Sequence, residues 1–308
     1  MKNFKLLMVQ DLIKKALAML LFVLLARFLT AEDFGKYQQV VLLFSLLAVV
    51  FSGGIPVSIG YFYGQARTFT KQVSMFKALF ILQLVSILVG AVFLYVFRKS
   101  ISFRLGNEYV EDLILFIILI SISISFSEFF KNLSVVTRKL KSYLYVTSSI
   151  QLFTVLSSLV VLLLTQNIYF IVAIAALFGV IQLLFLIKRN LKFLLPPLKG
   201  KKLSSIELRY IGAMASVGFV SVLNGYVDQI MVSTMLTVTD YAILKIGAFQ
   251  IPFISIITGS LLTSMLPIIS RYFKNNQLEN IVDEWKKSIE KATILLVPIV
   301  IYCLIFAE

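Results

Sequence analysis

Residues 168–187 read IYFIVAIAALFGVIQLLFLI, a run of twenty residues that contains no charged side chain. A helix of this length rises about 30 Å at 1.5 Å per residue, which matches the apolar thickness of a bilayer. Eight further apolar runs precede or follow it in the chain, at 12–29, 37–62, 75–97, 113–136, 143–164, 208–236, 241–269 and 289–307. The sequence therefore predicts an all-α polytopic membrane protein with about nine transmembrane helices.

The composition agrees with a membrane protein and excludes several kinds of chemistry. Of the 308 residues, 59% are hydrophobic and 14% charged, whereas soluble domains carry about 25% charged residues. Histidine is absent and Cys303 is the single cysteine, which excludes histidine catalysis, His- or Cys-based metal sites and an internal disulfide. The phosphate-loop motif G-x-x-x-x-G-K-[ST] does not occur. We therefore expect a non-enzymatic protein with no cofactor and no bound metal.

The basic residues predict the orientation of the chain. The formal net charge is +14, and 23 of the 29 lysines and arginines lie between alternate apolar runs, in the segments 2–15, 67–77, 131–141, 188–209 and 271–291. Cytoplasmic loops of membrane proteins are enriched in such residues. The N-terminus is therefore expected in the cytoplasm. Because the charge is spread over five short segments, we do not expect a nucleic-acid partner.

An internal repeat relates the two ends of the chain. The sequence LTAEDF at 29–34 aligns with LTVTDY at 236–241, an offset of 207 residues, and the same offset places the first two apolar runs on the seventh and eighth. Because six runs separate the copies, both have the same orientation, as in the parallel repeats of some transporters. We therefore expect a first six-helix bundle over 1–200 and an incomplete second bundle of three helices over 201–308.

Four segments carry a resemblance to a known family. They are LARFLTAEDFGKY at 25–37, GIP at 54–56, YVDQ at 226–229 and MLPIISR at 265–271. They resemble the polysaccharide and O-antigen flippases of the multidrug/oligosaccharidyl-lipid/polysaccharide exporter superfamily. The resemblance implies a MATE-like fold with two bundles of helices. Since such proteins usually have twelve or fourteen helices, it also implies that this chain is C-terminally truncated.

The resemblance implies a function as well. Such flippases move undecaprenyl-pyrophosphate-linked oligosaccharide from the inner to the outer leaflet of the bacterial cytoplasmic membrane, for the synthesis of O-antigen, capsule or exopolysaccharide. The implied partners are this lipid-linked substrate, membrane lipids, a coupling ion (H⁺ or Na⁺) and polysaccharide polymerase or assembly proteins. Two alternatives remain open: a cation-coupled multidrug exporter of the same superfamily, and a truncated flippase fragment without activity.

Ionisable residues within the predicted spans are the first site candidates, because each costs at least about 2.5–3.5 kcal/mol on insertion scales. Asp228 lies in the seventh run with Asn224 one helical turn before it, and Lys245 lies at a comparable depth in the eighth. These residues either line a hydrated substrate path or form a structural contact between neighbouring helices. An exporter would place acids in its first or seventh span, and 12–29 contains none.

Basic residues of the first span are further candidates. The guanidinium of Arg27 suits the oxygens of a pyrophosphate, although it could equally extend to the membrane surface. Lys14 and Lys15, at the opposite end of the run, either receive the same head group or serve only as a topology signal.

Other residues predict breaks, caps and pairs in the helices. Glycine and proline should interrupt the second and eighth runs, either as hinges or as static kinks; the candidates are Gly53, Gly54, Pro56, Pro252 and Pro267. Asp33 and Asp240 are expected to cap the helices that begin beside them. Glu128 and Lys131 have the spacing of an i,i+3 ion pair.

Overall fold

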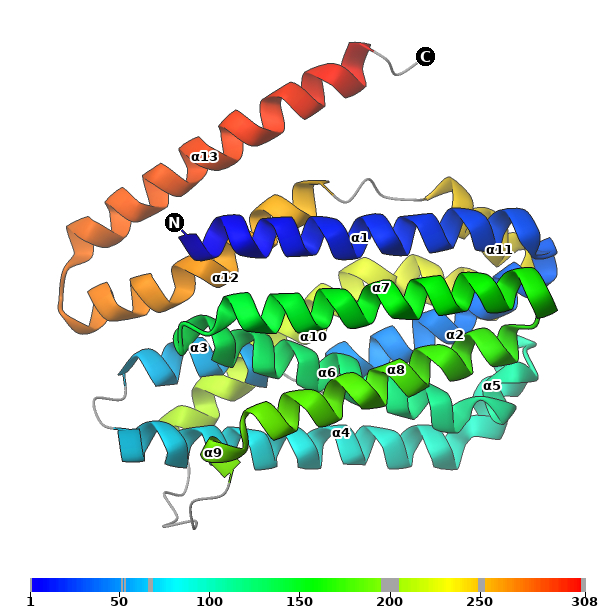
Figure 1. The fold of residues 1–308 in the computed structure, drawn as a ribbon, viewed down its shortest axis with the longest axis horizontal. Helices are drawn as coiled ribbons and strands as arrows, with labels where there is room; N and C mark the ends of the chain where they lie inside the picture. Colours follow the sequence, from blue (N-terminus) through cyan, green and yellow to red (C-terminus); the bar gives the residue numbers. More distant parts are fainter. Residues whose placement is uncertain are drawn as a thin grey trace.

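A computed structural model of the chain describes residues 2–50, 52, 54–65, 69–194, 205–248 and 253–305. Within these ranges the regular structure is α-helical and contains no strand, which confirms the all-α prediction. The helices are α1 (Lys2–Phe28), α2 (Ala31–Val50), α3 (Ile55–Gln65), α4 (Phe69–Leu105), α5 (Tyr109–Asp112), α6 (Ile114–Val136), α7 (Leu140–Thr165), α8 (Ile168–Arg189), α9 (Leu191–Leu194), α10 (Ser205–Met235), α11 (Val238–Gly247), α12 (Phe253–Lys274) and α13 (Leu278–Ile305). Figure 1 shows the long helices running side by side along the molecule.

Six segments of the described chain are long and apolar enough to cross a membrane. They are Ala31–Tyr63, which joins α2 and α3, Thr70–Leu105, Ile114–Val136, Leu140–Thr165, Ile168–Arg189 and Glu207–Met235. This result confirms a polytopic membrane protein, with six such segments where nine spans were predicted. Helix α1 falls outside the six, and its apolar run is diluted by the charges of Lys14, Lys15 and Arg27.

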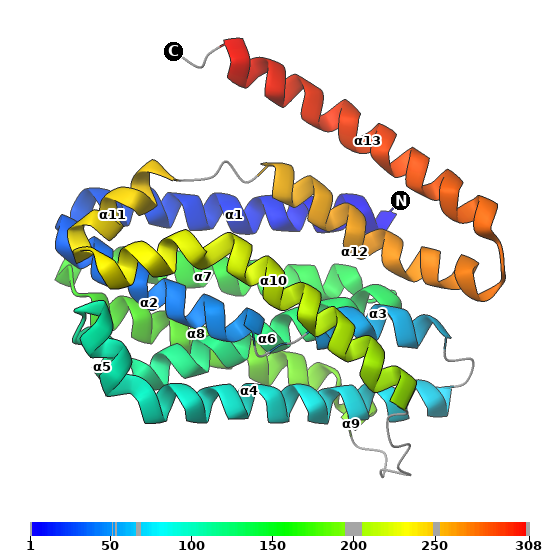
Figure 2. The ribbon, with the colours of Figure 1, turned by 180° about the vertical axis from the view of Figure 1, so that it is seen from behind.

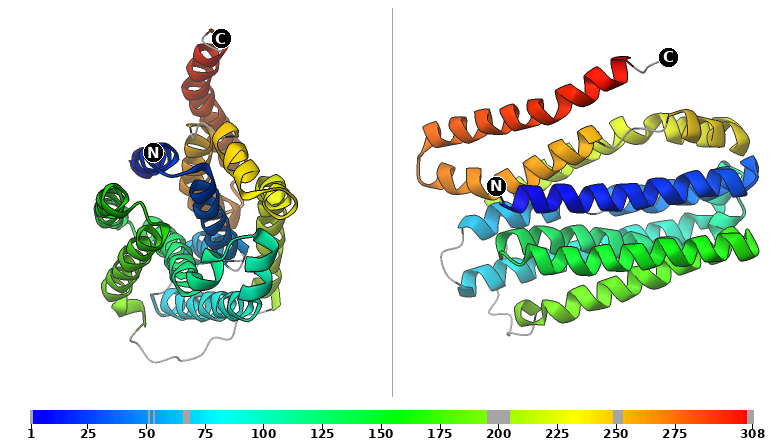
Figure 3. Two further views of the ribbon diagram at one scale, coloured as in Figure 1. Left: turned by 90° about the vertical axis from the view of Figure 1, so that its right-hand side faces the viewer. Right: turned by 45° about the horizontal axis from the view of Figure 1, so that its top comes forward.

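The packing builds one bundle from α1 to α8 and places α10, α11 and α12 against it. Helix α10 packs on α2 and α3, and α11 packs on α2; these contacts can be followed from behind in Figure 2. Helix α12 packs on α1 and α3, whereas α13 packs on α12 and projects from the rest of the bundle (Figure 3).

Two apolar clusters hold the first bundle together. One gathers the rings of Phe76, Phe129 and Phe130, all almost fully buried, from α4 and α6. The other joins Val40 and Ile117 with residues of α8. Each ring buried in this way contributes on the order of 2–3 kcal/mol in soluble proteins, and here the rings join helices that are distant in sequence.

The boundaries of the helices repeat at the offset found in the sequence. Helix α1 ends at Phe28 and α10 ends at Met235, while α2 begins at Ala31 and α11 begins at Val238. Both pairs are separated by 207 residues. The turn between the paired helices is therefore the same structural unit in the two copies.

The two turns are stabilised by the same cap, and threonine rather than aspartate is the N-cap residue. In the second copy, the Asp240 amide donates to the Thr237 hydroxyl (3.2 Å), and the amide and hydroxyl of Thr237 donate to the Asp240 carboxylate (3.1 and 2.6 Å). In the first copy, the Asp33 amide donates to the Thr30 hydroxyl (3.1 Å), which donates back to the carboxylate (2.7 Å). The hydrogen bonds from Thr237 lower the pKa of Asp240.

Replacing Thr237 with alanine is expected to lower the free energy of unfolding by about 1 kcal/mol, because it removes the N-cap acceptor and the donor to Asp240. The measurement is denaturant unfolding of the detergent-solubilised protein. Thr234→Ala is the matched control, since the Thr234 hydroxyl donates only within its own helix, to the carbonyls of Ile230 (2.7 Å) and Met231 (3.3 Å). Equal stability of the two variants would contradict a role for the cap.

Candidate functional site

A cavity of about 1050 Å³ lies inside the bundle, between α1, α2, α6, α7, α8, α10 and α11. Its wall mixes apolar side chains with amides, hydroxyls and charged groups. The charged residues that line it are Lys14, Lys15, Glu128, Asp228 and Lys245. Elements of both sequence copies therefore contribute to one polar space within the bundle.

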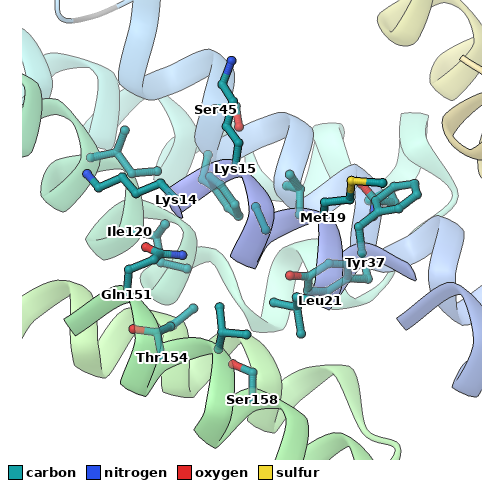
Figure 4. Close-up of a pocket in the computed structure, with 18 of the residues that line it drawn as sticks. Lys14, Lys15, Met19, Leu21, Tyr37, Ser45, Ile120, Gln151, Thr154 and Ser158 are labelled. Atoms are coloured by element: carbon teal, nitrogen blue, oxygen red, sulfur yellow. The ribbon is translucent and has the colours of Figure 1, made fainter. Parts of the chain in front are cut away.

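Lys14 and Lys15 bring two positive charges from α1 to this cavity. Their side chains diverge, with Lys14 pointing to the side of Gln151 and Lys15 to the side of Ser45 (Figure 4). The Lys14 ammonium makes no hydrogen bond or ion pair with any other residue that the structure describes. Asp11 and Glu128 attract this ammonium electrostatically without a hydrogen bond or ion pair, so its N–H donors remain unused within the described chain.

The structure also brings together the three candidates from the second copy. Asn224, Asp228 and Lys245 all line the cavity. The Lys245 ammonium donates to the side-chain oxygen of Gln229 (3.2 Å), and one Asp228 oxygen accepts from the backbone N–H of Gln229 (2.8 Å). The ion pairs of the described residues do not join Asp228 to Lys245, although the two groups attract each other electrostatically.

Arg27 is placed apart from the other candidates. Its side chain is exposed near the end of α1, and it does not belong to the cavity wall. This position is consistent with the guanidinium extending to the membrane surface.

Gly54 and Pro56 lie at a joint between helices as predicted, whereas Pro267 does not interrupt its helix, so the predicted break at Pro267 is wrong. The chain leaves α2 after Val50 and enters α3 at Ile55, and between them Gly54 has a φ of +69°. Pro56 occupies the first turn of α3, where a missing amide hydrogen costs nothing. Pro267 lies inside α12. Gly53 and Pro252 lie outside the described residues.

One cluster beside the cavity contains a residue that the sequence did not indicate. The Lys131 ammonium is 3.4 Å from a Glu128 oxygen, which confirms the predicted i,i+3 pair, and 3.9 Å from an oxygen of Asp11. The Ser260 hydroxyl donates to the other Asp11 oxygen (3.3 Å). We call Asp11, Glu128 and Lys131 the charged triad; with Ser260 it ties α1, α6 and α12 together.

Uncharged residues of the cavity were also missed. Gln38, Gln151 and Ser158 line it, but a glutamine or serine within an apolar run gives no signal of its own. One signal in the sequence could have identified some of them. The spacing i, i+3 and i+7 places Gln151, Thr154 and Ser158 on one helix face. Among the described residues, no group of three or more His, Cys, Asp or Glu side chains could hold a metal ion.

Together the fold and the cavity define a helical membrane protein with a cavity between its helices that is lined by apolar, polar and charged side chains. Residues 1–273 match the sequence model of a family described as polysaccharide biosynthesis protein, and the chain belongs to this family. The match agrees with the resemblance carried by the motifs at 25–37 and 265–271. Neither the curated proteins nor the solved structures contain a match to the chain.

Proposed function

We propose that the protein is a flippase that moves a polyprenyl-pyrophosphate-linked oligosaccharide from the inner to the outer leaflet of the bacterial cytoplasmic membrane. One observation carries the proposal: the cavity combines the unpaired ammonium of Lys14 with a wall of uncharged amides and hydroxyls. A pyrophosphate requires positive charge when it leaves water, and sugar hydroxyls require hydrogen-bond partners. The polyprenyl tail remains in the lipid and needs no polar path.

The charge distribution supports this direction of transport. With the N-terminus in the cytoplasm, Lys14 and Lys15 lie in the half of α1 that is nearer to the inner leaflet. A membrane potential that is negative inside favours outward movement of an anion by about 2.3 kcal/mol per charge per 100 mV. Delivery to the outer leaflet would supply a polysaccharide polymerase, the partner that this function implies.

The acids of the cavity favour a second candidate, a cation-coupled multidrug exporter. Glu128 and Asp228 could attract a lipophilic cation or hold a coupling H⁺ or Na⁺. The same wall carries Lys14, Lys15 and Lys245, so its three positive charges outnumber the two acids. This balance favours an anionic substrate over a cationic one.

The test is a flipping assay with the full chain in vesicles that contain polyprenyl pyrophosphate carrying a short oligosaccharide. Lys14→Met is expected to lower the rate at least about tenfold, because a charge-assisted hydrogen bond contributes roughly 1.5–3 kcal/mol. Lys99→Met is the control, since Lys99 is exposed on α4 and lies outside the cavity wall.

Each outcome of this assay has a separate meaning. If the wild-type protein did not flip the lipid but transported a lipophilic cation, the proposed function would be wrong and the protein would be a multidrug exporter. A wild-type rate in Lys14→Met would remove Lys14 from the substrate path.

A further inference from the structure

A row of polar side chains follows one face of α7 along the cavity wall. Gln151, Thr154 and Ser158 lie at intervals of three and four residues, which spans about 10 Å along a helix. Figure 4 shows the three side chains in sequence on α7, facing the space beneath α1. We call these three residues the α7 polar stripe.

The hydrogen-bonding capacity of the stripe is largely unused. Ser158 is 1% exposed, yet its hydroxyl has no hydrogen-bond partner among the described residues, and the Gln151 amide has none either. The Thr154 hydroxyl donates to the Ile150 carbonyl (2.8 Å) and can still accept. Because the three residues line the cavity, their amide and hydroxyl groups can form hydrogen bonds with a polar ligand there.

A further unpaired amide belongs to the same cavity. Gln38 of α2 is 4% exposed, and its side chain has no hydrogen-bond partner within the described chain. Other polar groups of the wall are already satisfied: the Ser123 hydroxyl donates to the Gly179 carbonyl (2.7 Å), and the Gln182 amide donates to the Ser127 hydroxyl (2.9 Å). The unpaired amides and hydroxyls therefore form a subset of the wall, which includes the α7 polar stripe, Gln38 of α2 and Asn224 of α10.

The chemistry of this subset selects a class of ligand. The stripe and Gln38 offer amides and hydroxyls, which both donate and accept, and they carry no charge. Sugar hydroxyls also donate and accept, whereas an anionic group would have to pair with Lys14. Since Lys14 points to the side of Gln151, a phosphate at its ammonium would leave an attached sugar next to the stripe.

We propose that the α7 polar stripe, together with Gln38, is a subsite for the uncharged sugar units next to the pyrophosphate. This inference rests on the proposed function. It adds which part of the substrate contacts the stripe and which part contacts Lys14. The pyrophosphate is held at Lys14, and the sugar chain extends along α7 from Gln151 towards Ser158. The stripe thus recognises the glycan, while Lys14 recognises the anion that all such lipids share.

The experiment compares the binding of two lipids by the full chain in nanodiscs. One probe is polyprenyl pyrophosphate alone, and the other is the same lipid carrying a neutral oligosaccharide. We expect wild-type protein to bind the glycosylated lipid more tightly, and Gln151→Leu/Ser158→Ala to lose about tenfold in affinity for that lipid only. Lys14→Met is expected to weaken binding of both lipids by the same factor.

The matched control is Ser157→Ala, because Ser157 is the chain neighbour of Ser158 and lies outside the cavity wall. Its affinities for both lipids are expected to stay within twofold of wild type. If the double variant does not fold, Ser158→Ala alone serves, with an expected loss of about threefold for the glycosylated lipid.

Several results would overturn the inference. Equal weakening of both lipids by the stripe variant would do so, as would equal wild-type affinities for the two lipids. Tighter binding of an acidic oligosaccharide than of a neutral one would also contradict an uncharged subsite. Failure of the wild-type protein to bind either lipid would overturn both the proposed function and the inference. The preceding results would overturn the inference alone, so the two failures can be told apart.

Discussion

Replacing Gly54 with alanine is expected to lower the free energy of unfolding by about 2–5 kcal/mol, through two separate effects. The residue has a φ of +69°, a region that costs an L-amino acid with a side chain about 1–2 kcal/mol. An added Cβ would also lie 2.6 Å from backbone and side-chain atoms of Met214 in α10. Overpacking of this kind costs about 1–3 kcal/mol, and here a backbone atom cannot move aside as the end of a flexible side chain would.

Gly106→Ala separates the two effects. Gly106 has a similar φ of +58°, but an added Cβ would meet no atom within 4 Å. This variant is therefore expected to lose only about 1–2 kcal/mol. Denaturant unfolding of both purified variants in the same detergent gives the comparison. Equal losses would mean that the close approach of Gly54 to α10 contributes nothing.

Because Gly54 has no side chain, it allows the two sequence copies to come into close contact. It lies at the joint between α2 and α3, and α10 packs on both helices. Gly35 likewise allows α2 to approach α11 closely, since an added Cβ would overlap the backbone of Val238 in α11. Helices of membrane proteins pack closely where residues are small, and these two glycines are such positions.

Features of the fold that depend on local sequence could be predicted. The length of each apolar run indicates a helix, because a chain in lipid must satisfy its backbone hydrogen bonds internally. The turns at Thr30 and Thr237 depend on four consecutive residues, so their recurrence was visible as a short repeat. The sequence analysis predicted Asp33 and Asp240 as the capping residues, whereas Thr30 and Thr237 occupy the N-cap positions. The sequence pattern shows which two residues form the cap, but not which of them precedes the first helical turn.

Features that depend on packing between distant helices could not be predicted. Gln38 and Ser158 are separated by more than a hundred residues, and only the packing of the bundle brings them to one cavity. Lys14, Asp228 and Lys245 were identified because charge within an apolar run is unusual by itself. Asp11 was passed over because it precedes the apolar run at 12–29, although it lies one helical turn before Lys14 and Lys15.

The charged triad provides the second large effect: Lys131→Met is expected to lower the free energy of unfolding by about 2–3 kcal/mol. The Lys131 side chain is 13% exposed, and its ammonium is the cation shared by Asp11 and Glu128. Removing one member of a buried pair costs about 3–5 kcal/mol. The expected loss is smaller here because the Glu128 side chain is 50% exposed, and water screens that half of the cluster.

The cause of the loss is that Asp11 and Glu128 lose the ammonium with which both form ion pairs, so removing their charge should restore stability. The triple variant Lys131→Met/Asp11→Asn/Glu128→Gln is expected to recover most of the loss, since the cost of breaking a buried ion pair comes from the uncompensated charge, which the amides do not carry. Lys141→Met is the control, because Lys141 is exposed, and a change of less than about 0.5 kcal/mol is expected. If the triple variant were no more stable than Lys131→Met, the loss would come from packing of the lysine stem, and the triad would not be the electrostatic link between α1, α6 and α12.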